Sequence, residues 1–138
     1  MGFDGYIICI VIRRWSDSMS QSIRILLMHY LTELQKIYGS HLKCVILYGS
    51  YARGDYTPDS DIDIMLLVDL SQEEIKKYSD ELSELNFKYN VQYDVWIMPV
   101  VKNKQHFAKW MEAYPFYSNV KREGVVLYSF ERNYSGTD

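Results

Sequence analysis

The chain has 138 residues, of which 48% are hydrophobic and 24% are charged, so its length and composition suit one compact folded domain rather than a disordered chain. The formal net charge of -3 argues against direct binding of nucleic acid through the phosphate backbone, because proteins that bind it usually present a basic face. A small nucleotide is not excluded, because a metal ion can supply positive charge locally.

The first 18 residues are predicted to be an extension of the chain, followed by a single domain over residues 19–138. Residues 6–12 (YIICIVI) form an apolar run that is too short to span a bilayer. Arg13 and Arg14 follow this run, whereas the positive charges of a secretory signal precede its apolar part. We therefore expect a cytoplasmic protein that does not enter a membrane.

Helices are predicted where apolar side chains recur at three- and four-residue steps. The first such segment begins at Ser20 and ends at Gly39, and the second begins at Ser71, which forms a capping box with Glu74. The second pattern continues to residue 89. Two shorter helices are expected later in the chain, at residues 103–112 and from Pro115 to Gly124.

Short apolar runs rich in β-branched residues predict strands at residues 42–48, 61–69, 91–98 and 125–128. The loop between the first two is about a dozen residues long, which is too short for a crossover helix of normal size, so these strands should be antiparallel neighbours. The expected fold class is α/β (α+β), with a mixed β-sheet flanked by helices.

The segment between the first two strands, GSYARGDYTPDSDID, predicts a phosphate site. Gly49 and Ser50 follow a strand and precede a turn that looks helical. A glycine lets a phosphate approach the backbone closely, and the free N–H groups of a helix start bind anions together with a serine hydroxyl. Arg53 is a further candidate for contact with a phosphate, although an ion pair with Asp55 or Asp59 explains a surface arginine equally well.

Asp61 and Asp63 predict a magnesium site beside this turn. Acids at i and i+2 of a strand project to the same side, with Cβ atoms roughly 6–7 Å apart, and two such carboxylates repel each other unless a cation lies between them. Asp94 is a single acid in the apolar run VQYDVWIM, where an unpaired charge is costly. If that strand lies beside the one at 61–69, Asp94 is expected to reach the same metal cluster. It would act there as general base or as ligand of the ion that activates the nucleophile.

Gly49-Ser50, ten further residues and then Asp61-x-Asp63, with a later acid on a strand, resemble the signature of the polymerase-β-type nucleotidyltransferase superfamily. The surrounding sequence LYGSYARGDYTPDSDIDIMLLVD and the distal REGVVLY (122–128) are similar to its minimal, MNT-type members. The resemblance covers nearly the whole chain.

This resemblance implies a polymerase-β-like nucleotidyltransferase core with a nucleoside triphosphate as substrate. It implies two Mg2+ ions held by Asp61, Asp63 and Asp94, and a triphosphate held by Gly49 and Ser50. Minimal members are commonly paired with an all-helical HEPN-type ribonuclease toxin, and some add AMP from ATP to a tyrosine of that toxin.

The function that the resemblance implies is magnesium-dependent transfer of AMP from ATP to a protein hydroxyl, with the protein acting as an antitoxin. Two alternatives remain open. One is a nucleotidyltransferase that modifies a small hydroxyl compound such as an aminoglycoside, although the chain holds no acceptor-binding domain. The other is a non-catalytic antitoxin that masks the toxin by binding alone.

Overall fold

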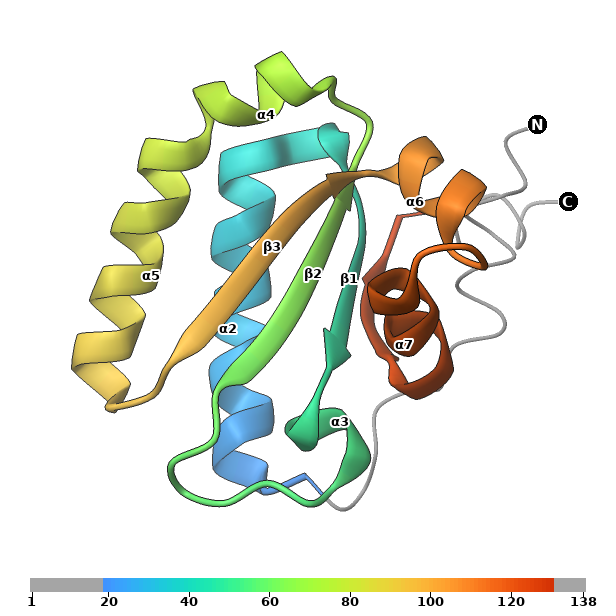
Figure 1. Cartoon of the computed structure of the whole chain (residues 1–138). Helices are drawn as coiled ribbons and strands as arrows, with labels where there is room; N and C mark the ends of the chain where they lie inside the picture. The colour runs from blue at the N-terminus through green and yellow to red at the C-terminus, as the bar shows by residue number, and fades with distance from the viewer. Residues whose placement is uncertain (1–18, 131–138) are drawn as a thin grey trace, which may run out of the picture.

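The computed structural model describes residues 19–130, so the predicted extension at 1–18 lies outside the described residues. One mixed sheet forms the centre of the fold, with helices on both of its faces (Figure 1). Its strands follow the order β3-β2-β1-β4, with bounds β1 Leu42–Tyr48, β2 Ile62–Val68, β3 Ile97–Asn103 and β4 Val125–Ser129. This arrangement confirms the predicted mixed sheet flanked by helices.

The pairing of the strands brings one end of each strand to the same edge of the sheet. β1 and β2 are antiparallel, as predicted, and Tyr48 lies opposite Asp63. β1 is also antiparallel to β4, whereas β2 and β3 are parallel and pair Ile62 with Ile97. The end of β1 therefore meets the starts of β2, β3 and β4, and the segments that carry the sequence motifs meet there.

The helix α2 (Gln21–Tyr38) forms as its sequence predicts. The hydroxyl of Ser20 accepts a hydrogen bond from the backbone N–H of Ile23, and Gly39 ends the helix with a φ of 58°. Its buried side chains recur at helical spacing and pack against the sheet. A single turn of 3-10 helix, Gly39–His41, then leads into β1.

The segment after β2 is helical over more of its length than predicted. α4 (Gln72–Lys77) begins at the predicted capping box, and α5 (Ser79–Tyr93) follows it directly. The predicted strand at 91–98 is wrong, because the apolar face of α5 continues through Tyr89 and the helix ends only at Tyr93. β3 therefore begins at Ile97, six residues later than expected.

Pro99 lies inside β3. The backbone N–H of Ile62 donates to the carbonyl of Trp96, so residues 96 and 98 direct their backbone toward β2. Pro99 then directs its backbone to the open side of this edge strand, where a missing N–H removes no hydrogen bond from the ladder. The neighbouring outward N–H, that of Ile97, donates to the side chain of Asn90 at 2.9 Å.

The remaining elements are the short helices α3 (Ser50–Arg53), α6 (Lys104–Trp110) and α7 (Pro115–Glu123). α2 and α5 cover one face of the sheet, and α6 and α7 cover the other (Figure 1). On β2, Ile64 packs on the α2–α5 side, and Met65 packs on the α6–α7 side. Because side chains alternate along a strand, Asp61 and Asp63 share the α6–α7 face. In the part of the chain that the structure describes, no helix is long and apolar enough to cross a membrane.

Candidate active site

Gly49 and Asp63 are in direct contact at the edge where the strands meet. The backbone of Gly49 has a φ of 77°, a conformation that residues with a side chain rarely adopt. A Cβ atom at this position would lie 2.3 Å from Oδ2 of Asp63. The glycine is therefore required twice, once for its backbone conformation and once because the carboxylate occupies the space of a side chain.

Ser50 is the first residue of α3, and polar groups at this helix start make no hydrogen bond within residues 19–130. The carbonyl of Gly49 accepts hydrogen bonds from the N–H groups of Ala52 and Arg53, both at 3.0 Å. The N–H groups of Ser50 and Tyr51 precede the first bond within this helix, as at any helix start. Within residues 19–130 the hydroxyl of Ser50 has no hydrogen-bond partner. The helical turn predicted after Gly49 is present, and its role in phosphate binding stays a prediction.

Asp61 and Asp63 lie close enough at the start of β2 for the charge of Asp61 to act on Asp63. Asp61 is exposed, and Asp63, which pairs with Tyr48 of β1, is partly buried. Burial raises the pKa of Asp63, and the charges of Asp61 and Glu123 raise it further, against an opposing effect of Arg53. This crowding of carboxylates is the property that the sequence predicted for a cation site.

Asp94 does not lie in a strand, contrary to the prediction. It is the C-cap of α5, exposed to solvent, with a φ of 53° in the left-handed region. In residues 19–130, no group of three or more His, Cys, Asp or Glu side chains is arranged to hold a metal ion. The structure thus brings Asp61 and Asp63 together without completing a trio. Asp94 nevertheless lies at the same edge of the sheet, three residues before Ile97.

Glu123 belongs to the site, although sequence reasoning gave it no role. Its Oε1 accepts a hydrogen bond from the N–H of Gly49 at 3.1 Å and another from Nη1 of Arg53 at 2.9 Å. Leu47 pairs with Val125, so the same register places Gly49 opposite Glu123 just before β4. The segment REGVVLY contains this glutamate, but only the β1–β4 pairing shows what it contacts.

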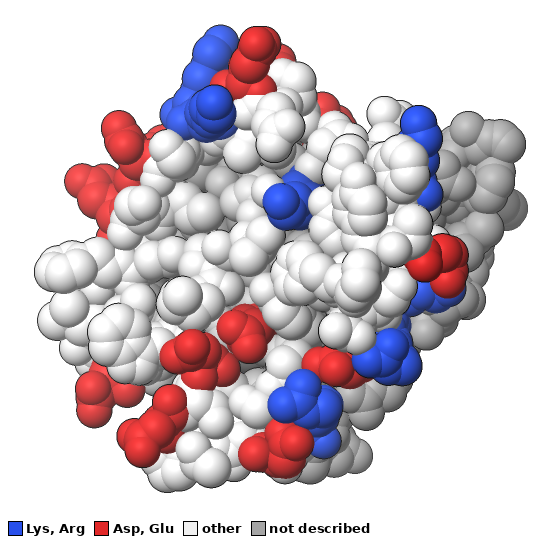
Figure 2. Space-filling model, viewed as in Figure 1, with Lys and Arg blue, Asp and Glu red and all other residues white. Residues whose placement is uncertain are grey.

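The guanidinium group of Arg53 is bound by two carboxylates. Its Nε donates to Oδ2 of Asp55 at 3.2 Å, and its Nη1 donates to Glu123. The ion pair with Asp55 that was weighed against a phosphate contact is therefore present. Figure 2 shows acidic side chains gathered over the lower part of this face, near α3 and the start of β2.

Aromatic side chains border the acidic edge. Tyr48 lies opposite Asp63, and its pKa is raised to about 12 by burial and then by the charge of Asp63. The ring of Tyr48 packs edge-on against Phe116 of α7, with 5.6 Å between the ring centroids. On the other side, Trp96 precedes β3 with 63% of its surface exposed. The acids thus lie in a surface that also offers apolar contact to a bound molecule.

The family model described as the nucleotidyltransferase domain matches residues 27–122, which include the glycine–serine turn and all three aspartates. The chain belongs to this family. The mixed sheet and its helices are accordingly the polymerase-β-like nucleotidyltransferase core that the resemblance implied.

Two relatives of this nucleotidyltransferase come from Methanocaldococcus jannaschii. "Putative protein adenylyltransferase MJ0604" is 37% identical over 99 residues, which are 72% of this chain and 91% of the relative. "Putative protein adenylyltransferase MJ0141" is 35% identical over 72 residues, which are 52% of this chain and 71% of the relative. A chain in the structure of tri-AMPylated Shewanella oneidensis HEPN toxin in complex with MNT antitoxin is 18% identical, with a TM-score of 0.46. That match covers 81% of this chain and 77% of the other.

The contact of Gly49 with Asp63 gives a first prediction. Gly49→Ala should lower nucleotidyl transfer, because the new methyl group forces the Asp63 carboxylate out of its place. Gly39→Ala is a matched control, since Gly39 also has a positive φ of 58° but nothing lies within 4 Å of its added Cβ. Both variants should lose about 1–2 kcal/mol of unfolding free energy through backbone strain. Equal activity of the two variants would contradict the assignment of the Gly49–Asp63 contact to the active site.

A second prediction separates stability from activity at Asp94. A negative charge at the end of a helix opposes the helix dipole, so Asp94→Asn should raise the unfolding free energy by about 0.3–1 kcal/mol. If Asp94 is the general base, the same change lowers the transfer rate roughly a hundredfold or more. Denaturant unfolding and a transfer assay on the same preparation measure both effects. An unchanged rate would remove Asp94 from the mechanism.

A third prediction concerns the charge of Glu123. Glu123→Gln keeps an oxygen that can accept from the N–H of Gly49 but removes a negative charge that raises the pKa of Asp63. The pKa of Asp63 should therefore fall, and Asp63 should deprotonate at a lower pH. Carbon NMR of the carboxyl group measures this directly. Glu112→Gln removes the ion pair of Glu112 with Lys121 and should leave the Asp63 titration unchanged.

Proposed function

We propose that this nucleotidyltransferase transfers AMP from ATP to a hydroxyl group of a partner protein, with magnesium bound to the triphosphate. The observation that supports this most directly is the contact of the Asp63 carboxylate with Gly49, beside Asp61 and the open start of α3. Paired carboxylates that would be neutralised by a cation thus lie beside a helix start whose N–H groups are suited to a phosphate. This is the combination that an Mg2+–nucleotide complex requires.

The donor set fits magnesium. Mg2+ prefers oxygen ligands and is commonly bound by one or two carboxylates together with substrate phosphates. The pKa of Asp63 is raised first by burial and then by the charges of Asp61 and Glu123, and a divalent cation would relieve this repulsion between carboxylates. In the proposal Asp61 and Asp63 hold the metal, which neutralises charge on the phosphates when bound. Gly49 and Ser50 bind the triphosphate, with Arg53 as a further candidate.

Asp94 is proposed as the third carboxylate, either as a ligand of a second ion or as the general base. In the parallel register of β2 and β3, Trp96 continues the ladder opposite Asp61. If residues 94–96 extended β3, alternation would put residues 94 and 96 on the face that carries Asp63. A local change of backbone after α5 would therefore be enough to bring Asp94 to the site.

The chemistry is an in-line displacement at the α-phosphorus of the nucleotide. The acceptor oxygen forms a bond to this phosphorus while the bond to the bridging oxygen breaks, and pyrophosphate leaves. The proton of the acceptor hydroxyl passes to Asp94 or, through water, to solvent. Gly49 and Ser50 would hold the phosphates in line with the acceptor, since positioning supplies much of the rate in such reactions.

A protein acceptor is proposed because the relative MJ0604 is named as a putative protein adenylyltransferase. The match covers 91% of the length of that relative. The exposed side chains Trp96 and Phe116 give the edge an apolar border suited to a protein surface. Following the resemblance to MNT-type proteins, the acceptor would be a tyrosine of a HEPN-type ribonuclease toxin in the cytoplasm. The protein would thereby act as its antitoxin.

The decisive experiment is a transfer assay, which is the fourth prediction. The protein is mixed with ATP labelled on the α-phosphate, magnesium and the product of the neighbouring gene. We expect label on a tyrosine of that product, lost with a chelator and reduced roughly a hundredfold or more by Asp61→Asn. Asp80→Asn, an exposed acid in the first turn of α5, is the control and should retain transfer.

Two outcomes of this assay would favour the other functions. Inhibition of the toxin by Asp61→Asn without ATP would show that binding alone masks the toxin. Label on an aminoglycoside but not on the protein would show a small-molecule acceptor. Absence of magnesium-dependent ATP binding would refute both catalytic hypotheses, transfer to a protein and transfer to a small hydroxyl compound.

A further inference from the structure

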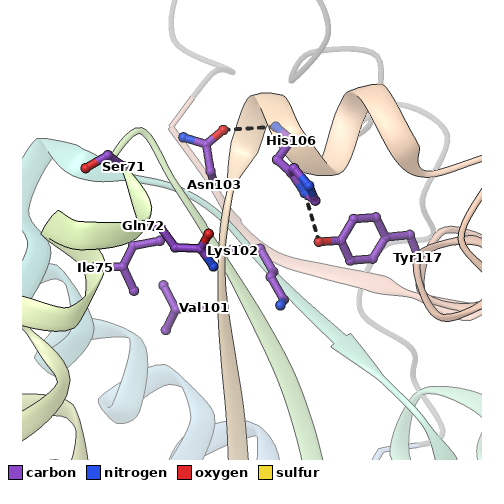
Figure 3. Close-up of a pocket in the computed structure, with 8 residues that line it drawn as sticks. All are labelled: Ser71, Gln72, Ile75, Val101, Lys102, Asn103, His106 and Tyr117. Atoms are coloured by element: carbon purple, nitrogen blue, oxygen red, sulfur yellow. Dashed lines mark hydrogen bonds between the residues drawn. The ribbon is translucent and has the colours of Figure 1, made fainter.

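A cavity lies at the opposite end of the sheet from the acidic edge. Its volume is about 270 Å3, and it is lined by Ser71, Gln72, Ile75, Val101, Lys102, Asn103, His106 and Tyr117 (Figure 3). The register pairs Asp63 with Met98 and Val68 with Asn103. Five residues of strand therefore separate the two sites, which is roughly 16 Å. The cavity is a separate site rather than an extension of the first.

The lining of this cavity is basic, although the protein as a whole is acidic. None of its eight residues is an aspartate or glutamate, and Lys102, which is half-buried as a residue, contributes an ammonium group. Within residues 19–130 this ammonium group makes no ion pair or hydrogen bond. Figure 2 shows a basic group surrounded by uncharged atoms over the C-terminal half of β3. A partly buried charge without a counterion favours binding of an anion.

Other hydrogen-bonding groups of the lining remain available to a ligand. Nδ1 of His106 lies 3.1 Å from the hydroxyl of Tyr117, so the two side chains hold each other in place (Figure 3). Burial raises the pKa of Tyr117, with a further effect from Tyr114, so its hydroxyl keeps its proton. The carboxamide of Gln72 makes no hydrogen bond to any other residue in the described part of the chain.

The two helix starts at the cavity are not the source of binding. The side chain of Ser71 accepts a hydrogen bond from the N–H of Glu74 and caps α4. The side chain of Asn103 accepts from the N–H of His106 and caps α6, while it donates to the carbonyl of Leu70. The donors left for a ligand are side chains, with Lys102 as the charged one.

We propose that this cavity binds a small ligand with an anionic oxygen group, a phosphate or a carboxylate, on Lys102. The carboxamide of Gln72 would hydrogen-bond the same group. With His106 Nδ1 as the donor to the Tyr117 oxygen, the hydroxyl proton of Tyr117 would also be free for the anion. The apolar side chains of Ile75 and Val101 would contact the rest of the molecule. The volume is slightly below the range typical of drug-sized ligands, so the ligand is smaller than a nucleoside triphosphate. This site does not depend on the proposed transfer reaction.

The test, our fifth prediction, is an NMR titration of the full chain with inorganic phosphate or succinate, at ionic strength matched with sodium chloride. We expect saturable shifts of the backbone amides of Gln72 and Asn103. The probe that binds more tightly identifies a phosphate or a carboxylate ligand. Lys102→Gln should weaken this binding about tenfold or more, because it removes a charge-assisted hydrogen bond. Tyr117→Phe should weaken it less.

Lys109→Gln is the matched control, because Lys109 lies in the same helix as His106 but is exposed and contacts the ring of Trp110. It should bind both probes as the unchanged protein does. Equal affinity of Lys102→Gln and the unchanged protein would overturn the proposal. So would shifts confined to Ser50–Arg53, which would place the anion at the acidic edge instead.

Discussion

The contact between the Asp63 carboxylate and the bare backbone of Gly49 is the constraint on which the rest of the site depends. It exists because β1 and β2 pair with Tyr48 opposite Asp63, so the residue after β1 reaches the start of β2. It also fixes the neighbouring groups. Glu123 binds the N–H of Gly49 from the opposite side, and α3 starts from its carbonyl. In this nucleotidyltransferase core, the glycine–serine turn follows β1 and the paired acids lie at the start of the adjoining β2, so their proximity is set by strand pairing.

Sequence reasoning succeeded where the signals are local. The capping box of Ser71 with Glu74 and the short loop between β1 and β2 are decided by neighbouring residues, and both are present as predicted. It failed at residues 91–98, where a short apolar run suits a strand or the last turn of a buried helix equally well. The buried helix face formed by Leu82, Leu85 and Tyr89 explains why the first part of this run is the last turn of α5 and not a strand.

The parts of the site that the sequence did not reveal depend on pairing between distant segments. Glu123 is a side chain at the end of α7, and its contact with Gly49 follows only from the register of β1 with β4. The place of Asp94 follows from where α5 ends, which is a property of packing. The distribution of charge is likewise a result of the fold, since carboxylates gather at one edge of the sheet, while near the other lies Lys102, which makes no ion pair within residues 19–130.

The open side of β3 has a consequence for how this protein meets other molecules. Pro99 offers no donor there, and the amide of Ile97 is already satisfied by Asn90. A foreign strand that approached would find no free donor at either of these two successive outward positions of β3, so accretion of further strands, the first step toward fibrils, is discouraged at this border. Recognition on this flank must consequently come from the shape and chemistry of side chains, not from shared backbone bonds.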